Sequence, residues 1–210
     1  RALFKLGSHF VIKSSSEHSR FSLPVSVPEW IANKAGDWSF TFAEVEEGID
    51  VPASELGTVV DVDELHAWVA EEFSSEKFIS RLRSEIELRH LRPLQDGLQI
   101  RLNDIDLKPA ELVLTAAENF RPIRGEKDIP ANGSVVHMDL YAGLVHLADD
   151  NDDDTDDPQK FRSESNAGWY LFCNDRLLLA RDKSRLTGWG EVAAAFHPQY
   201  RQFRGYVFLA

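Results

Sequence analysis

The order in which hydrophobic periodicities follow one another most strongly limits what this chain can fold into. Apolar and polar residues alternate, as in β-strands, in several segments before residue 63. Apolar residues then recur at helical spacing over residues 63–92, after which the alternation returns. This order indicates an α+β or mixed α/β protein, and we expect the former, with two mixed β-sheets that each have helices on one face. Because regular βαβ alternation is missing, a doubly wound sheet or a TIM barrel is not expected.

The first part of the chain, residues 1–63, is expected to consist mainly of strands. Residues 1–6 have the pattern of a helix end, with Gly7 as the C-cap. Pro28 should end the second strand, since proline has no N–H for the hydrogen-bond ladder. Alternating aromatic residues at Trp38, Phe40 and Phe42 predict a third strand. In all, strands are expected over residues 9–14, 20–27, 38–42 and 57–62.

The second part, residues 64–210, is expected to be a separate domain, because the periodicity changes from strand to helix near residue 63. Two helices are predicted over residues 63–73 and 75–92, and Ser74 or Ser75 can cap the second. A hairpin is predicted over residues 98–105. Further strands are expected over residues 112–115, 134–147, 168–174, 177–181 and 203–209.

One segment supplies most of the formal net charge of −12. Seven aspartates lie between Asp149 and Asp157, and they leave a net charge of only −5 in the rest of the chain. The run lacks the glycine and glutamate that a calcium-binding loop needs at its sixth and twelfth positions. We therefore interpret it as a solvated, self-repelling loop. An acidic chain also repels phosphate backbones, which disfavours nucleic-acid binding through its overall charge.

Cysteine use and hydropathy indicate the compartment. Cys173 is the single cysteine, so no internal disulfide can form, which fits a reducing, cytoplasmic environment. Its apolar surroundings in sequence predict an inert core thiol. No apolar run approaches the roughly 20 residues of a membrane span, and the first residues lack the apolar core of a signal peptide.

Evidence for a metal site is weak. His137 and Asp139 lie two residues apart on a predicted strand and hence on one face, as a pair of ligands could. No third ligand has a diagnostic spacing, so a structural histidine is favoured and no metal site is expected. The motifs of α/β-hydrolases, P-loop proteins and zinc proteases are also missing from the sequence.

Two other segments are more specific. Gly57-Thr58 opens a predicted strand, where the threonine hydroxyl can hydrogen-bond the edge of a base; the simpler interpretation is a turn into a strand. Lys183 lies in a basic, glycine-containing loop that follows a predicted hairpin with its turn at Asn174-Asp175. Such a loop can bring a lysine to an anionic ligand, and the simpler interpretation is a surface loop.

Together these segments resemble the GHKL superfamily of ATPases, which includes gyrase B, MutL, the heat-shock chaperones and the MORC proteins. Arg1-Ala2-Leu3-Phe4-Lys5-Leu6-Gly7 is similar to the helix that follows the glycine-rich lid in bacterial members, and Gly57-Thr58-Val59-Val60 to the strand that closes the ATPase sheet. Residues 72–78, 174–177 and 203–208 are similar to the linker and to parts of the transducer domain. The resemblance implies that residues 1–63 are the C-terminal part of a GHKL ATPase domain and residues 64–210 a transducer with a ribosomal-protein-like α/β fold.

The resemblance also implies ATP and Mg²⁺ as cofactors of the intact protein, with neither bound tightly by this chain alone. Thr58 would contribute to the adenine pocket, Arg1 would lie near the phosphates, and Lys183 would sense the γ-phosphate, with Arg181 and Arg185 as competing candidates. The catalytic glutamate, the Mg²⁺-binding asparagine and the lid are expected upstream. No catalytic residue is therefore assigned here, and the chain alone should not hydrolyse ATP.

The expected function is a conformational switch that couples nucleotide state to dimerisation or partner engagement. Its expected partners are the N-terminal half of the ATPase domain and a second copy of the protein, with no membrane. An alternative is a non-enzymatic interaction module in which the acidic loop, residues 149–157, recruits a basic partner. Nucleic-acid binding is a third possibility, disfavoured because glutamates lie among the cations of the helix predicted over residues 75–92.

Overall fold

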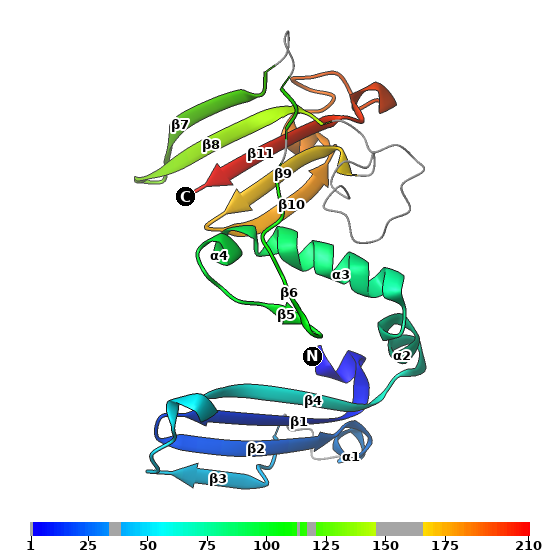
Figure 1. Cartoon of the computed structure of the whole chain (residues 1–210), viewed down its shortest axis with the longest axis vertical. Coiled ribbons are helices and arrows are strands. Elements are labelled where there is room, and N and C mark those ends of the chain that lie inside the picture. Colours follow the sequence, from blue (N-terminus) through cyan, green and yellow to red (C-terminus); the bar gives the residue numbers. More distant parts are fainter. Residues whose placement is uncertain (1, 34–38, 113, 117–120, 146–165) are drawn as a thin grey trace. The chain divides into compact units, whose positions relative to one another are not determined.

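The computed structural model describes residues 2–33, 39–112, 114–116, 121–145 and 166–210 (Figure 1). The chain forms two compact units, Arg1–Phe78 and Ile79–Ala210, whereas the change in periodicity lies near residue 63. The α+β class is confirmed. Among the helices of the described residues, none is long and apolar enough to cross a membrane.

The first unit contains a four-stranded sheet in the order β3-β2-β1-β4, and each neighbouring pair is antiparallel. Strands β1 and β2 form a hairpin whose register pairs Ser16 with Ser19, so that only Glu17 and His18 form the turn. Strand β4 is one of the two outer strands. The elements are η1 (Leu3–Lys5), β1 (Gly7–Ser16), β2 (Ser19–Ser26), α1 (Val27–Ala32), β3 (Glu44–Glu47), η2 (Ala53–Glu55), β4 (Gly57–Leu65) and α2 (Ala67–Phe73).

Aromatic packing in this unit explains why the predicted third strand was wrong. Phe40 and Phe42 lie in irregular backbone, and the strand that pairs with β2 begins at Glu44; Trp38 lies outside the described residues. The ring of Phe40 stacks on Trp30 with centroids 6.0 Å apart, and that of Phe42 meets Phe21 edge-on at 5.0 Å. The aromatic residues therefore pack against other elements without forming a strand.

Two further expectations for this unit are corrected. Gly7 is not a helix C-cap but the first residue of β1, and Leu6 caps the short η1 turn. Pro28 does follow the second strand, as predicted, but it stands in the first turn of α1, a helix that the sequence pattern did not indicate. Proline is tolerated there because the first N–H groups of a helix have no intrahelical partner.

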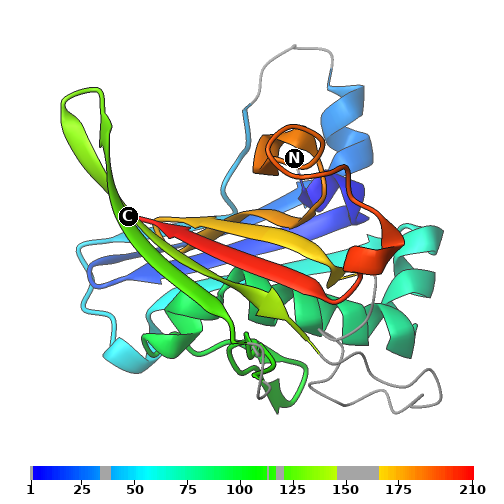
Figure 2. The ribbon, with the colours of Figure 1, turned by 90° about the horizontal axis from the view of Figure 1, so that it is seen from above.

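The second unit contains a five-stranded mixed sheet in the order β10-β9-β11-β8-β7 (Figures 1 and 2). Strands β9 and β11 run parallel, and the other neighbouring pairs are antiparallel. The elements are α3 (Glu76–Arg89), α4 (Leu91–Gln95), β5 (Arg101–Leu102), β6 (Ile105–Asp106), β7 (Ile123–Ala131), β8 (Ser134–Leu144), β9 (Gly168–Cys173), β10 (Arg176–Asp182), η5 (Arg185–Thr187), η6 (Pro198–Tyr200) and β11 (Phe203–Leu209).

The core of this unit lies between the sheet and the helices. Alternation along β9 buries Tyr170 and Phe172 on one face, where Leu88 and Leu91 of the helices join them. The predicted cap of the second helix is confirmed, because the amide of Phe78 donates to Ser75 Oγ at 3.3 Å. Trp169 takes the opposite face of β9 and contacts Phe203.

Two segments of the second unit differ from the sequence prediction. The described residues of segment 112–115 form no strand, although Thr115 donates its amide to the carbonyl of Leu144 at 2.7 Å. Strand β7 was not predicted, because its run of charged residues with Gly125 and Pro130 lacks the apolar alternation of a buried strand. It is an outer strand of the sheet, where such residues are accepted.

Candidate functional site

Two of the three residues predicted to meet nucleotide belong to different units, Thr58 to the first and Lys183 to the second. Arg1 lies outside the described residues, as does the acidic run, residues 149–157.

Thr58 is the second residue of the outer strand β4. Its register partner on β1 is Ser14, and the two hydroxyl oxygens lie 2.8 Å apart in a hydrogen bond. Both hydroxyls are near the surface, and each has lone pairs left for a ligand or water. The next two residues, Val59 and Val60, are 56 % and 45 % exposed although successive side chains of a strand point to opposite faces. Strand β4 thus exposes apolar side chains on both faces around Thr58.

Lys183 follows β10 directly, and a compact turn fixes the start of its loop. The Asp182 carboxylate accepts hydrogen bonds from the Ser184 amide at 3.0 Å and from Thr187 Oγ1 at 2.7 Å. Burial opposes the ionisation of Asp182, but these hydrogen bonds outweigh it and lower its pKa. The Ser184 hydroxyl accepts from the Leu186 amide and caps η5. The backbone on either side of Lys183 is therefore well fixed.

An aromatic cluster holds the far side of the same loop. Trp189 is 8 % exposed, and its ring lies 5.1 Å from Phe196, 5.4 Å from Tyr200 and 5.5 Å from Phe203. Phe203 in turn meets Trp169 edge-on at 5.1 Å. The Lys183 ammonium lies 4.8 Å from the centroid of the Phe196 ring, within the range of a cation–π contact. Lys183 could be predicted as a candidate from the sequence, but its aromatic partners were not predicted, because their only signal was the density of aromatic residues after Gly188.

Arg181, one of the two competitors of Lys183, is already engaged. Its Nη2 lies 2.8 Å from Glu85 Oε1 on α3, and its Nε donates to Asn166 Oδ1 at 2.6 Å. Arg181 also sits at an irregularity of β10 with a positive φ of 58°. This residue joins α3 to the end of β10, two positions before Lys183. Arg185, the second competitor, is exposed at the start of η5.

A polar network that no sequence pattern predicted lies near this end of β10. Tyr170 is fully buried and donates to the carbonyl of Asn166 at 2.7 Å; burial raises the pKa of Tyr170 to about 12. Arg204, 1 % exposed, donates to the carbonyls of Arg201 and Phe203 at 3.1 and 2.8 Å. Burial lowers the pKa of Arg204, and its guanidinium nevertheless stays charged, as arginine does throughout proteins.

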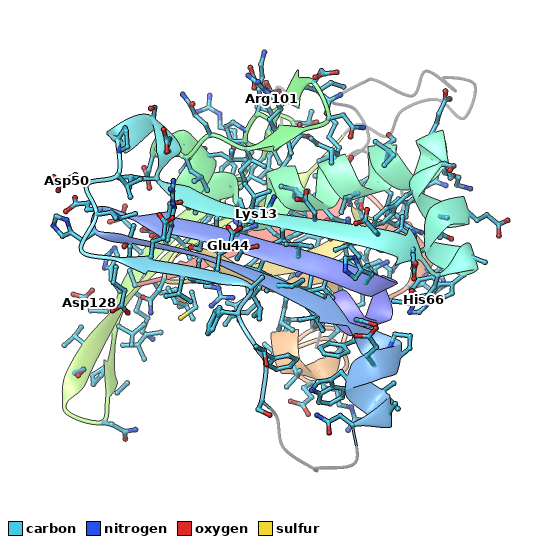
Figure 3. All side chains as sticks on the ribbon, turned by 90° about the horizontal axis from the view of Figure 1, so that it is seen from below. Lys13, Glu44, Asp50, His66, Arg101 and Asp128 are labelled. Atoms are coloured by element: carbon cyan, nitrogen blue, oxygen red, sulfur yellow. The ribbon has the colours of Figure 1, made fainter. Side chains whose placement is uncertain are left out.

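His137 and Asp139 do meet, but in an ion-paired cluster. His137 Nδ1 lies 2.8 Å from Asp128 Oδ1 across the β7–β8 hairpin, and its Nε2 lies 3.4 Å from Asp139 Oδ1 (Figure 3 labels Asp128). The hydrogen bond to Asp128 raises the pKa of His137. Within the described ranges, no group of three or more His, Cys, Asp or Glu side chains could hold a metal ion.

Cys173 and the β9–β10 turn complete the predicted features. Cys173 is partly exposed and lies on the face of β9 opposite Tyr170 and Phe172, so it is not the core thiol that the sequence indicated. The turn at Asn174-Asp175 is confirmed, with positive φ angles of 44° and 64° that suit a tight hairpin.

No protein-family model matches the sequence, and a search of curated proteins finds no match.

Proposed function

We propose that this chain is part of an ATP-binding conformational switch of the GHKL type, in which residues 1–63 complete the nucleotide domain and residues 64–210 act as the transducer. The observation that carries the proposal is the setting of Lys183. This cation stands directly after β10, on a loop anchored by the buried Trp189 ring and the aromatic rings around it. Among the described residues, its contact is an aromatic ring and no carboxylate pairs with it. A lysine so placed remains able to bind a phosphate oxygen.

The surroundings of Thr58 support the same proposal. Strand β4 is an outer strand that exposes Val59 and Val60 on opposite faces, so it leaves apolar surface on both faces that another segment of a protein can cover. We propose that the upstream half of an ATPase domain pairs with β4 and covers these side chains. Thr58 would then lie beside the adenine, with its hydroxyl shared between Ser14 and the base.

The proposed cofactors are ATP and Mg²⁺, with Mg²⁺ held by the upstream half. The catalytic glutamate is also assigned to that half, so this chain by itself is expected to lack ATPase activity. A cytoplasmic location and a homodimeric intact protein belong to the same proposal. The described residues would act after nucleotide binding, by coupling the occupied site to the transducer.

A titration of nucleotide tests the role of Thr58. In the protein with its proposed upstream segment, Thr58→Val removes the hydroxyl at nearly constant volume and is expected to weaken ATP binding about tenfold. Thr41→Val makes the same chemical change in an exposed, irregular segment and should leave affinity unaltered. ATP affinity is measured by isothermal titration calorimetry. Absence of ATP binding by the parent protein would refute the proposal, and equal affinity of both variants would remove Thr58 from it.

A second candidate is a non-enzymatic interaction module. The loop after β10 exposes Leu186 to 82 % and Val192 to 94 %, the two highest values among the large hydrophobic side chains of the described residues. Exposed apolar side chains on a well-anchored loop are typical of surfaces that bind another protein. Partner binding that persists without any response to ATP would favour this candidate.

A further inference from the structure

The loop between Lys183 and Phe196 is closed at its base by the side chains of these two residues. The Lys183 ammonium lies 4.8 Å from the centroid of the Phe196 ring, although 12 residues separate them along the chain. Both positions are fixed by other interactions. The Asp182 turn holds the backbone beside Lys183, and Trp189 meets the Phe196 ring nearly perpendicularly, at an interplanar angle of 78°.

Phe196 is itself held by the buried Trp189. Trp189 is 8 % exposed and packs against Tyr200 and Phe203 as well as Phe196. These contacts join the loop to β11, because Phe203 is the first residue of that strand. The ring that receives Lys183 is therefore part of an ordered cluster, and the face that it offers to the ammonium is fixed.

The indole of Trp189 adds a second observation about this loop. Its Nε1 is buried and has no hydrogen-bond partner among the described residues. A buried N–H without an acceptor is unfavourable, so the aromatic packing around Trp189 must outweigh this cost.

We propose that Phe196 is a positioning residue for Lys183, and that the contact of its ring with the ammonium sets how readily Lys183 reaches an anion. While the ammonium lies on the ring, it must leave this contact before it can bind a phosphate oxygen elsewhere. A cation–π contact near the surface reduces the fraction of Lys183 side chains that are free to bind an anion by about two- to fivefold. The link to nucleotide rests on the proposed function, whereas the contact itself does not.

Fluorinated phenylalanines at position 196 test the contact with little change of shape. Each added fluorine weakens the attraction of the ring for a cation. The reactivity of Lys183 toward a limiting amount of an acetylating ester is measured by peptide mass spectrometry, with Lys127 on β7 as the internal reference. The parent chain is compared with mono-, di- and trifluorophenylalanine, Phe196→Leu and Phe196→Trp.

We expect Lys183 to be acetylated about two- to fivefold faster in Phe196→Leu, with rates that rise stepwise along the fluorine series and stay at or below the parent rate in Phe196→Trp. Equal rates along the fluorine series would overturn the proposal. A faster rate in Phe196→Leu alone would also overturn it, because that result reports loosened packing. Near-ultraviolet circular dichroism of each variant verifies that the aromatic cluster is retained.

The same variants separate this inference from the proposed function. In the protein with its upstream segment, Phe196→Leu is expected to raise the apparent affinity for ATP about two- to fivefold when Lys183 is present, and to have no effect in a Lys183→Ala background. Equal effects in both backgrounds would overturn the positioning role. If the parent protein does not bind ATP, the proposed function fails, and the acetylation result still decides whether Phe196 holds Lys183.

Discussion

Replacement of Gly205 by alanine tests how the second unit is packed. Gly205 lies in β11, inside the five-stranded sheet, and its register partner on the parallel neighbour β9 is Trp169. The Trp169 ring lies across this glycine: a Cβ atom on Gly205 would stand 2.8 Å from Cδ2 of the ring and closer still to Cε3 and Cζ3. The ring must move to accept a methyl group, and it also packs edge-on against Phe203.

Two effects of opposite sign determine the size of the change. Overpacking a filled site costs about 1–3 kcal/mol. Alanine also restricts the conformations of the unfolded chain, which stabilises the folded protein by about 0.4–1 kcal/mol. The free energy of unfolding should therefore fall by about 1–2 kcal/mol, as measured by urea denaturation followed by circular dichroism. Because Trp169 contacts Phe203 and Phe203 contacts Trp189, the near-ultraviolet signal of the aromatic cluster should change as well.

The chain supplies a matched control. Gly125 is also a strand glycine, but a Cβ atom there would have nothing within 4 Å, and its φ is not in the left-handed region. Gly125→Ala should be neutral or slightly stabilising. In addition, the cost of Gly205→Ala should shrink when Trp169 is first replaced by leucine, which frees the space above the glycine. Equal stability of Gly205→Ala and Gly125→Ala would refute the reasoning.

Two other predictions concern titrating side chains of the second unit. Because Asp128 raises the pKa of His137 above its ordinary 6.5, the pairing should stabilise the β7–β8 hairpin below about pH 6.5 and lose this effect as the pH rises through the raised pKa. Hydrogen exchange of the hairpin amides as a function of pH measures it, and Asp128→Asn should weaken the dependence to the part that Asp139 supplies; a hairpin equally protected at all pH values would contradict it. Tyr170→Phe removes the hydrogen bond to the Asn166 carbonyl and should cost about 1–2 kcal/mol in the free energy of unfolding. A urea midpoint identical to that of the parent would show that this bond contributes nothing.

Hydrophobic patterning predicted the strands that carry runs of β-branched and aromatic residues. Segments 9–14, 168–174 and 203–209, which are rich in such residues, correspond to β1, β9 and β11. Strand β7 was not predicted, because its exposed side chains include Glu126, Lys127 and Asp128 and the strand therefore has no apolar face in its sequence pattern. Phe40 and Phe42 caused the opposite error, a predicted strand that does not form. Alternating aromatic residues can also pack against other elements from irregular backbone.

The candidate site could be predicted only in part for a similar reason. Lys183 stands out in sequence because a basic, glycine-containing loop follows a hairpin turn. Its contact with Phe196 depends on Trp189 and Phe203, which lie at unrelated spacings and come together only through the path of the loop. From the sequence, Arg181 competed with Lys183 as a candidate for sensing phosphate. Its ion pair with Glu85 could not be predicted, because that pair depends on how α3 packs on the sheet.

Steady-state ATP hydrolysis by the protein with its proposed upstream segment tests the central claim most directly. Lys183→Ala is compared with Lys127→Ala, which removes the same charge from the exposed strand β7. Loss of a charge-assisted hydrogen bond to phosphate corresponds to about a tenfold or greater decrease in turnover. We predict that decrease for Lys183→Ala and unchanged turnover for Lys127→Ala. Equal turnover of Lys183→Ala and the parent protein would contradict the account.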